Sequence, residues 1–331
     1  YSLLYLCGYK SISLEDIKKF RQINSICAGH PEYKEGSGIE TTTGPLGQGL
    51  GNAVGMAIAE EIYRKKFGST AINNKTYVIA SDGDLMEGIS HEAMSLAGHL
   101  KLKNLIVFFD NNKISIDGST SLSVSDNYKK RFESYGWNFL EINGHNEKQI
   151  SKAITKVSKS NKPTLVSCKT IIGFGSPNKS GKASSHGSPL GEEEIALVRK
   201  KLKWNNKPFK IPQEILNEWR EIGSKGELLE KKWHETLNKK NSKIKSDLEK
   251  NYLNSNLENL ENLIKKEKTK YFESKPSLAT RQCSMAAIES ISALLPQLIG
   301  GSADLSGSNN TKTNNSKIIN SKNFDGNYIH Y

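Results

Sequence analysis

The sequence predicts an α/β protein in which a parallel sheet is flanked by helices, followed by a helical connector and the start of a second α/β domain. Apolar runs alternate with helical patterns from residue 13 to about residue 205, as in sheets built from strand–helix–strand units. The apolar runs lack alternating polar residues, which indicates strands buried on both faces. Charged helical segments then replace this pattern, and a new loop–helix–strand order begins near residue 270.

The first domain is expected at residues 1–205, and its elements follow from local patterns. Ser13 and Asp16 have the spacing of a capping box, so a helix should run from there to about residue 23. The helix after Gly47 should bury one stripe, made of Leu50, Val54, Ile58 and Ile62. Strands are expected at about 76–81, 104–109, 138–142 and 164–170, with helices near 87–101, 126–135 and 147–158.

Residues 206–265 form the predicted connector, in which Pro208 and Pro212 precede charged helical segments that favour a solvent-exposed surface. Residues 266–331 begin the second α/β domain. The Asn-, Ser- and Lys-rich stretch 309–323 is expected to be a mobile loop. The chain begins without Met and its last residues do not resemble a finished domain, so truncation at both ends is expected.

Composition and charge argue against several classes of function. The longest apolar run, residues 105–109, is too short to cross a bilayer, so no membrane partner is expected. The formal net charge of +12 is spread over many segments without a nucleic-acid-binding motif, which favours phosphorylated metabolites over nucleic acid as partners. The four cysteines lack CxxC spacing, which favours reduced, buried thiols over a disulfide framework or zinc site. The cytoplasm is the expected compartment.

The segment TYVIASDGDLMEGISHE, residues 76–92, places acidic side chains where a buried strand ends. Asp82 follows this strand, and Asn112 follows the next strand, one crossover helix later. Ligands of open α/β sheets bind on such loops, outside the carboxyl ends of the strands. A polar turn with helix-capping residues is the alternative interpretation of the same pattern.

A carboxylate and an amide oxygen that face one another across neighbouring strands can share a hard cation, Mg²⁺ or another divalent ion such as Ca²⁺. The side chains of Asp82 and Asn112 would be two ligands, and the Ile114 carbonyl is the natural third. Gly83 has no Cβ to keep a diphosphate from the backbone. The sequence therefore predicts a metal and diphosphate site at this edge of the sheet.

These two turns resemble the diphosphate–magnesium motif of thiamine-diphosphate-dependent enzymes. The wider match is to the transketolase family. It is carried in order by GHPEY (29–33), TTTGPLGQG (41–49), SDGDLMEG (81–88), GHLKLKNL (98–105), DNNKISIDG (110–118), IIGFGSPNKSG (171–181), SHGSPLG (185–191), ATR (279–281) and GGSADLSGS (300–308). The sequence has Ser81 where the family usually has Gly, and Lys182 with Ala183 where relatives often have a histidine.

The resemblance implies thiamine diphosphate as cofactor, with the metal held by the three ligands named above and the diphosphate against the backbones of Gly83 and Asn112. It places Gly44, Pro45 and Leu46 against the cofactor, although their loop alone could equally be one that starts a helix. Glu87, which by itself favours a helix dipole, matches a glutamate at the family's dimer interface, beside the cofactor. A homodimer is therefore expected.

Two histidines, His30 and His186, lie in loops that do not suit a core side chain, and the resemblance makes them the expected catalytic and substrate-binding imidazoles. By resemblance, His30 hydrogen-bonds the donor sugar, and His186 contacts the diphosphate and the substrate and takes part in proton transfer. Arg281 and Ser308 are assigned to the phosphate of the sugar, which a guanidinium fork and a hydroxyl suit. The remaining histidines are expected to be structural or solvent-facing: His91, His99, His145, His234 and His330.

The activity implied is reversible transfer of a two-carbon ketol group in the pentose phosphate pathway, from xylulose 5-phosphate to ribose 5-phosphate or erythrose 4-phosphate. By resemblance, the glutamate that activates the pyrimidine lies after Tyr331, with most of the pyrimidine-binding domain and the C-terminal domain. The isolated chain is thus expected to bind its cofactor weakly and not to turn over. Alternatives are dihydroxyacetone synthase, deoxyxylulose-phosphate synthase, or a non-catalytic cofactor-binding half that needs a partner chain.

Overall fold

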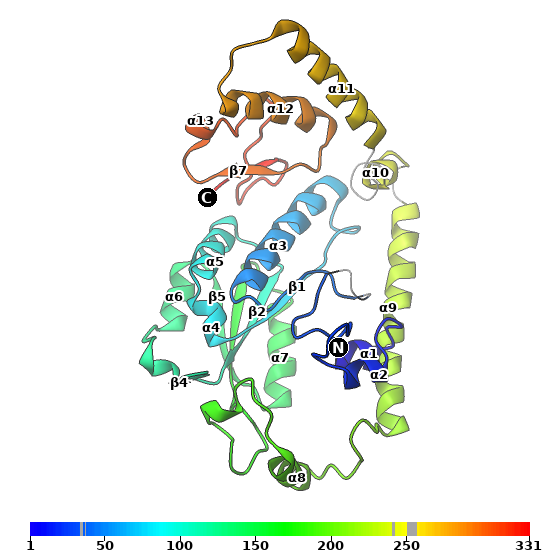
Figure 1. Cartoon of the computed structure of the whole chain (residues 1–331), viewed down its shortest axis with the longest axis vertical. Coiled ribbons are helices and arrows are strands. Elements are labelled where there is room, and N and C mark those ends of the chain that lie inside the picture. The colour runs from blue at the N-terminus through cyan, green and yellow to red at the C-terminus, as the bar shows by residue number, and fades with distance from the viewer. Residues whose placement is uncertain (34–35, 37, 240–241, 250–256) are drawn as a thin grey trace. The chain divides into compact units, whose positions relative to one another are not determined.

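The computed structural model describes residues 1–33, 36, 38–239, 242–249 and 257–331. The chain divides into two compact units (Figure 1). The first unit consists of Tyr1–Ile58 and Asn74–Lys231, and the second of Ala59–Asn73 and Lys232–Tyr331. None of the helices in the described part of the chain combines the length and the apolar character of a membrane span.

The first unit is built on a parallel sheet in the strand order β1-β2-β6-β5, which confirms the predicted fold class. The strands are β1 (Thr76–Ala80), β2 (Leu105–Asn111), β5 (Asn138–Asn143) and β6 (Thr164–Lys169). Ala80 pairs with Phe109, so the carboxyl ends of β1 and β2 lie side by side. A short hairpin, β3 (Ile114–Ser115) and β4 (Gly118–Ser119), follows β2 directly.

Helices precede, connect and follow these strands. They are α1 (Ser2–Cys7), α2 (Leu14–Lys18), α3 (Gln48–Phe67), α4 (Asp82–Met86), α5 (Gly88–Leu100), α6 (Tyr128–Ser134), α7 (Glu147–Val157), α8 (Glu192–Lys201) and α9 (Gln213–Asn238), with the 3₁₀ turns η1 (Thr120–Leu122) and η2 (Ala183–Ser185). The last residues of α3 and of α9 belong to the second unit. The predicted stripe of α3 is buried at Leu50, Val54, Ile58 and Ile62.

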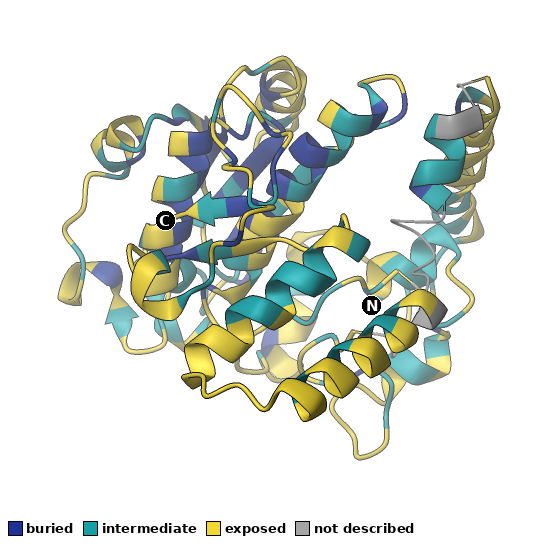
Figure 2. Ribbon diagram, turned by 90° about the horizontal axis from the view of Figure 1, so that it is seen from above, coloured by how far each residue is buried: buried dark blue, intermediate teal, exposed yellow. Residues whose placement is uncertain are grey.

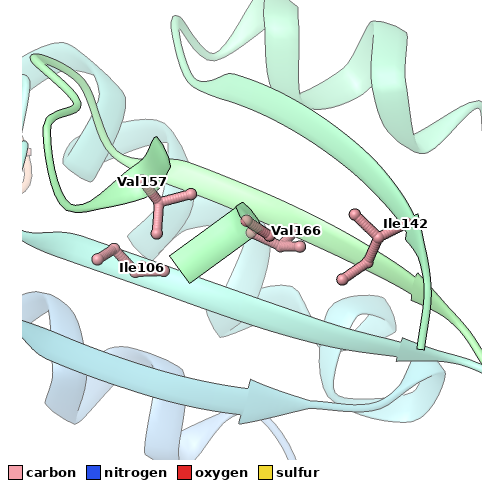
Figure 3. Packing of buried hydrophobic residues seen from close by; sticks show 5 residues of the cluster. Ile106, Ile142, Val157 and Val166 are labelled. Atoms are coloured by element: carbon pink, nitrogen blue, oxygen red, sulfur yellow. The ribbon is translucent and has the colours of Figure 1, made fainter. Parts of the chain in front are cut away.

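Successive side chains of a strand point to opposite faces of the sheet, and in the central strands both faces are covered. On one face, Ile106, Val166 and Ile142 pack against Val157 of α7 (Figure 3). On the other face, Phe109 makes an edge-to-face contact with Tyr128 of α6. Figure 2 shows the buried residues gathered in the strands and on the inward stripes of neighbouring helices.

The prediction that the strands are buried on both faces is confirmed for β2 and β6 but wrong for β1. Tyr77 and Ile79 of β1 are exposed, Ile79 to 85%. β1 is an edge strand, and α7 packs on the far side of the sheet, against β5. Helix α7 therefore does not cover this face of β1, and periodicity along one strand cannot show which strand will lie at an edge.

Two other local predictions need correction. Helix α2 has the predicted capping box of Ser13 and Asp16 but ends at Lys18 rather than near residue 23. The chain turns back there, since Arg21 adopts a positive φ of 62° and its N–H donates to the Cys27 carbonyl. Cys27 is buried as predicted, whereas Cys283 is exposed on a helix surface.

The second unit has its own small core, in which Phe67 and Ala71 pack with Leu237 and Leu248. The indole N–H of Trp233 donates to the Ala71 carbonyl at 2.8 Å. Its other elements are α10 (Ser242–Asp247), α11 (Leu257–Ser274), α12 (Thr280–Leu294), β7 (Gly300–Ser302), α13 (Ser306–Asn309) and β8 (Tyr328–His330), with β7 and β8 parallel. The division into domains at residues 205 and 265 stays a prediction, as does the mobility of residues 309–323.

Candidate active site at the carboxyl end of the sheet

Two predicted binding segments, GHPE and TTTGPLGQG, contact each other directly. Gly44 adopts a φ of 132°, a conformation that only glycine adopts readily. A Cβ on Gly44 would lie 2.4 Å from Cγ of His30. The imidazole therefore lies beside Gly44, and a side chain at position 44 would displace it.

The same glycine-rich loop reaches the turn that follows β1. The backbone N–H of Gly47 donates to Asp84 Oδ1 at 3.3 Å. A Cβ on Gly83 would lie 3.2 Å from Leu46 Cδ1, so Leu46 lies close against that glycine. Three predicted segments, those of His30, Leu46 and Gly83, thus meet at the carboxyl end of β1.

Ser81 and Asp84 fix the turn between β1 and α4. The backbone N–H and the hydroxyl of Ser81 both donate to Asp84 Oδ2, at 2.8 and 2.9 Å. This arrangement accommodates the serine that the sequence has in place of the family's usual glycine. Because Asp84 is occupied by these bonds and by Gly47, the other aspartate of the turn, Asp82, remains for a ligand.

Asp82 is a buried carboxylate with one unsatisfied oxygen. The residue is only 3% exposed. Its Oδ1 accepts a 3.3 Å hydrogen bond from the Tyr128 hydroxyl, whereas Oδ2 has no partner among the described residues. Burial raises the pKa of this carboxyl, and the Tyr128 hydrogen bond offsets part of the rise. An orphaned buried carboxylate oxygen fits a site for a divalent cation.

Asn112 and Ile114 follow the neighbouring strand, and α4 packs against both β2 and β3. The amide oxygen of Asn112 accepts the Ile114 N–H at 2.9 Å, which leaves it a second lone pair. In the described residues no cluster of three or more His, Cys, Asp or Glu side chains could hold a metal. A metal here would therefore need ligands other than three such side chains.

A cavity of about 730 Å³ lies beside Asp82. Lys113, Thr120, Asn127 and Tyr128 also line it. Lys113 belongs to the DNNKISIDG segment, whereas Thr120 of η1 and the residues at the start of α6 lie outside the motifs recognised in the sequence. The cavity gives a ligand access to the buried carboxylate from one side.

The loop that carries His186 is fastened by a buried glutamate, Glu194, in the first turn of α8. Glu194 accepts hydrogen bonds from the Ser176 hydroxyl and from the backbone and side-chain N–H groups of Asn178, the last two at 2.9 Å. Led by the Ser176 hydrogen bond, these contacts lower the pKa of Glu194 to about 2. His186 itself is exposed. Within the described residues, no hydrogen bond joins its side chain to Asp82.

Comparison with known proteins identifies the family. The model of the family "Transketolase, thiamine diphosphate binding domain" matches residues 1–258. The transketolase of Buchnera aphidicola subsp. Acyrthosiphon pisum is 50% identical over 340 residues, a match that covers all of this chain and 50% of the relative. The chain belongs to the transketolase family.

Solved transketolase structures agree with this fold. The Campylobacter jejuni enzyme superposes with a TM-score of 0.85 at 39% identity, and the Pichia stipitis enzyme in complex with sedoheptulose 7-phosphate with 0.89 at 35%. Each match covers all of this chain and 50% of the known one. The chain thus spans about half the length of the transketolases it matches.

The remaining predicted site residues are Glu87, Arg281 and Ser308. Glu87 is exposed between α4 and α5, where its Cβ would lie 2.8 Å from a Cβ on Gly47. Arg281 and Ser308 belong to the second unit and are exposed. Arg281 lies in the first turn of α12 and Ser308 in α13, so both stand on short or starting helices.

The other histidines make structural contacts or face solvent. His145 accepts the Ile171 N–H at 2.9 Å and stacks on Phe174 with ring centroids 4.1 Å apart. His91 is hydrogen-bonded to the Tyr135 hydroxyl at 3.1 Å. Exposed among these five are His99, His145, His234 and His330.

Proposed function

We propose that this chain supplies the metal- and diphosphate-binding half of a transketolase, which transfers a two-carbon ketol group from a ketose phosphate to an aldose phosphate in the pentose phosphate pathway. The observation that carries the proposal is the meeting of His30, Leu46 and Gly83 beside the buried, half-satisfied carboxylate of Asp82. We place the enzyme in the cytoplasm, where thiols such as Cys27 stay reduced.

The metal would be held by Asp82, by the amide oxygen of Asn112 and by the carbonyl of Ile114. Mg²⁺ accepts such oxygen ligands and keeps further positions for phosphate oxygens and water. Gly83 would let the diphosphate approach the backbone, because glycine has no Cβ. Among the described residues, Leu46 is the only side chain from another segment within 4 Å of the position that a Cβ would take. Gly44, Pro45 and Leu46 would form the wall against the rest of the cofactor.

Thiamine diphosphate, when bound, supplies the chemistry that lets a carbon–carbon bond beside a carbonyl break and re-form. The protein positions and protonates the sugar. His30 would hydrogen-bond the donor sugar from its fixed position on Gly44, and His186 would move a proton at a sugar hydroxyl. Arg281 and Ser308 would bind the sugar phosphate. Xylulose 5-phosphate as donor and ribose 5-phosphate or erythrose 4-phosphate as acceptors fit these groups.

A second copy of the chain is the proposed partner. Glu87 is solvent-exposed beside the cofactor-binding loops, as expected of a residue that meets its counterpart across a homodimer interface. Size-exclusion chromatography with light scattering on the intact protein would test this. A monomer at micromolar concentration would contradict the dimer but leave the metal site in place.

The test of the function is a coupled assay on the intact protein with xylulose 5-phosphate as donor. Ribose 5-phosphate should be used as acceptor far better than formaldehyde, and pyruvate should not serve as donor. Preference for formaldehyde would indicate a dihydroxyacetone synthase, and use of pyruvate a deoxyxylulose-phosphate synthase. Asp82→Asn should abolish turnover and cofactor retention, whereas Asp325→Asn, an exposed change in the second unit, should leave both within twofold.

A further inference from the structure

Tyr128 reaches the metal site from a distant part of the chain. It is the first residue of α6 and lies 46 positions after Asp82, yet its hydroxyl donates to Asp82 Oδ1 at 3.3 Å. Both residues line the same cavity. The contact is made by a single hydroxyl group, so its role can be separated from that of the aromatic ring.

The ring of Tyr128 is held by packing that does not involve a ligand. Its edge meets Phe109 of β2, with ring centroids 4.7 Å apart and planes at 60°. On the ring lies the Arg131 guanidinium, 5.7 Å from the centroid. That guanidinium is itself fixed by an ion pair to Asp126 at 2.9 Å and a hydrogen bond to the Leu85 carbonyl at 2.6 Å. The hydroxyl is therefore positioned before any metal binds.

The Tyr128 hydroxyl is the donor in this hydrogen bond. A phenol has one proton to donate, and an ionised carboxylate oxygen can only accept it. With Oδ1 occupied in this way, the buried oxygen of Asp82 that has no partner is Oδ2.

We propose that Tyr128 is a positioning residue for the divalent cation: its hydroxyl holds Oδ1 of Asp82 and so orients Oδ2 toward the metal. The inference rests on the proposed metal site. Hydrogen bonds to a ligating carboxylate set its orientation, and their loss commonly weakens metal binding by about 10- to 100-fold. The role belongs to the hydroxyl, because the ring would remain packed in a phenylalanine variant.

The experiment measures Mn²⁺ binding to the intact protein by calorimetry, with and without thiamine diphosphate. Tyr128→Phe should raise the Kd for Mn²⁺ about 10-fold or more. The matched control is Tyr135→Phe, which removes a hydroxyl hydrogen-bonded to His91 just after the same helix, and it should leave the Kd within twofold. The Tm of the metal-free protein should be the same for Tyr128→Phe and wild type to within a few degrees.

A kinetic readout separates positioning from general damage. In Tyr128→Phe the Mn²⁺ concentration for half-maximal activity should rise in parallel with the Kd, while kcat at saturating Mn²⁺ stays within about twofold of wild type. A kcat that saturating metal does not restore would overturn the inference, as would an unchanged Kd. If Asp82→Asn binds Mn²⁺ as wild type does, the metal site itself is wrong, an outcome distinct from failure of the tyrosine alone.

Discussion

At the scale of single residues, the proposed metal ligand Asp82 carries a cost in stability. The residue is nearly inaccessible and Oδ2 lacks a partner. Burial raises its pKa, so the ionised form opposes folding at neutral pH, and this cost disappears only as the pH falls below the ordinary value of a carboxyl. A residue that binds a cation at the expense of the metal-free fold is typical of a functional site.

Asp82→Asn should therefore have opposite effects on stability and on binding. We expect the metal-free variant to be as stable as wild type or more stable, by up to about 1 kcal/mol, because a buried charge is removed while the Tyr128 hydrogen bond can be kept. Added Mg²⁺ with thiamine diphosphate should raise the Tm of wild type by mass action but not that of the variant. Thermal unfolding with and without metal measures both effects. A large loss of stability in the metal-free variant would contradict this account.

Gly44 tests the contact between the two binding loops. Its positive φ and the His30 ring beside it leave no room for a Cβ. Gly44→Ala should cost about 1–3 kcal/mol and displace His30, which would raise the KM for the donor sugar. The matched control is Gly55→Ala in α3, where a Cβ would meet nothing within 4 Å and helix propensity favours alanine by about 1 kcal/mol. Chemical denaturation should show a lower free energy of unfolding for Gly44→Ala and a higher one for Gly55→Ala.

At the scale of elements, the hydrogen bonds of Glu194 hold the loop that carries His186 onto the start of α8. Because they lower its pKa to about 2, this attachment is complete above the ordinary pKa of 4.5 and is lost as the pH falls through about 2. Glu194→Gln replaces one acceptor with a donor that faces the Asn178 amide. Hydrogen-exchange protection of the Asn178 and Lys179 amides should then fall about tenfold at neutral pH.

The control for this prediction is Glu193→Gln, which alters the exposed neighbour of Glu194 on the same helix turn. It should leave the protection of both amides unchanged. In wild type, the same loss of protection should appear only in strongly acidic solution. If it appears near pH 4.5, the carboxylate is not held by these hydrogen bonds.

The sequence predicted the strands and the site loops within a few residues because their signals are local. Buried apolar runs mark β2 and β6, and Gly44 and Asp82 stand in motifs that can be recognised along the chain. What it could not predict is pairing across the fold. Tyr128 follows an ordinary helix cap at Asn127, and Glu194 is one of three glutamates that suit any helix start. Their partners, Asp82 and Ser176, are known only once the strands are ordered.

The exposure of β1 has the same explanation. A run such as TYVIA is apolar whether its strand lies in the middle or at the edge of a sheet. Only the strand order makes β1 an edge strand and leaves Ile79 without α7 above it. Long-range order, not propensity, decides this kind of burial.

At the scale of the whole molecule, the division into two compact units predicts two unfolding steps. Ile106 is fully buried in the core under α7, whereas Leu237 is buried in the small core shared by the ends of α3 and α9. These cores have no residue in common. Truncation of either side chain to alanine should lower the free energy of unfolding of the unit that contains it by about 2–5 kcal/mol.

Calorimetry on the two variants measures whether these cores are independent. Ile106→Ala should lower the temperature of one transition and Leu237→Ala that of the other, since domains with separate cores need not unfold together. Ile79→Ala, at an exposed position of β1, should change the free energy of unfolding of neither unit by more than about 0.5 kcal/mol. If both core variants shift a single common transition, α3 and α9 transmit the loss between the units, and the chain unfolds as one cooperative body.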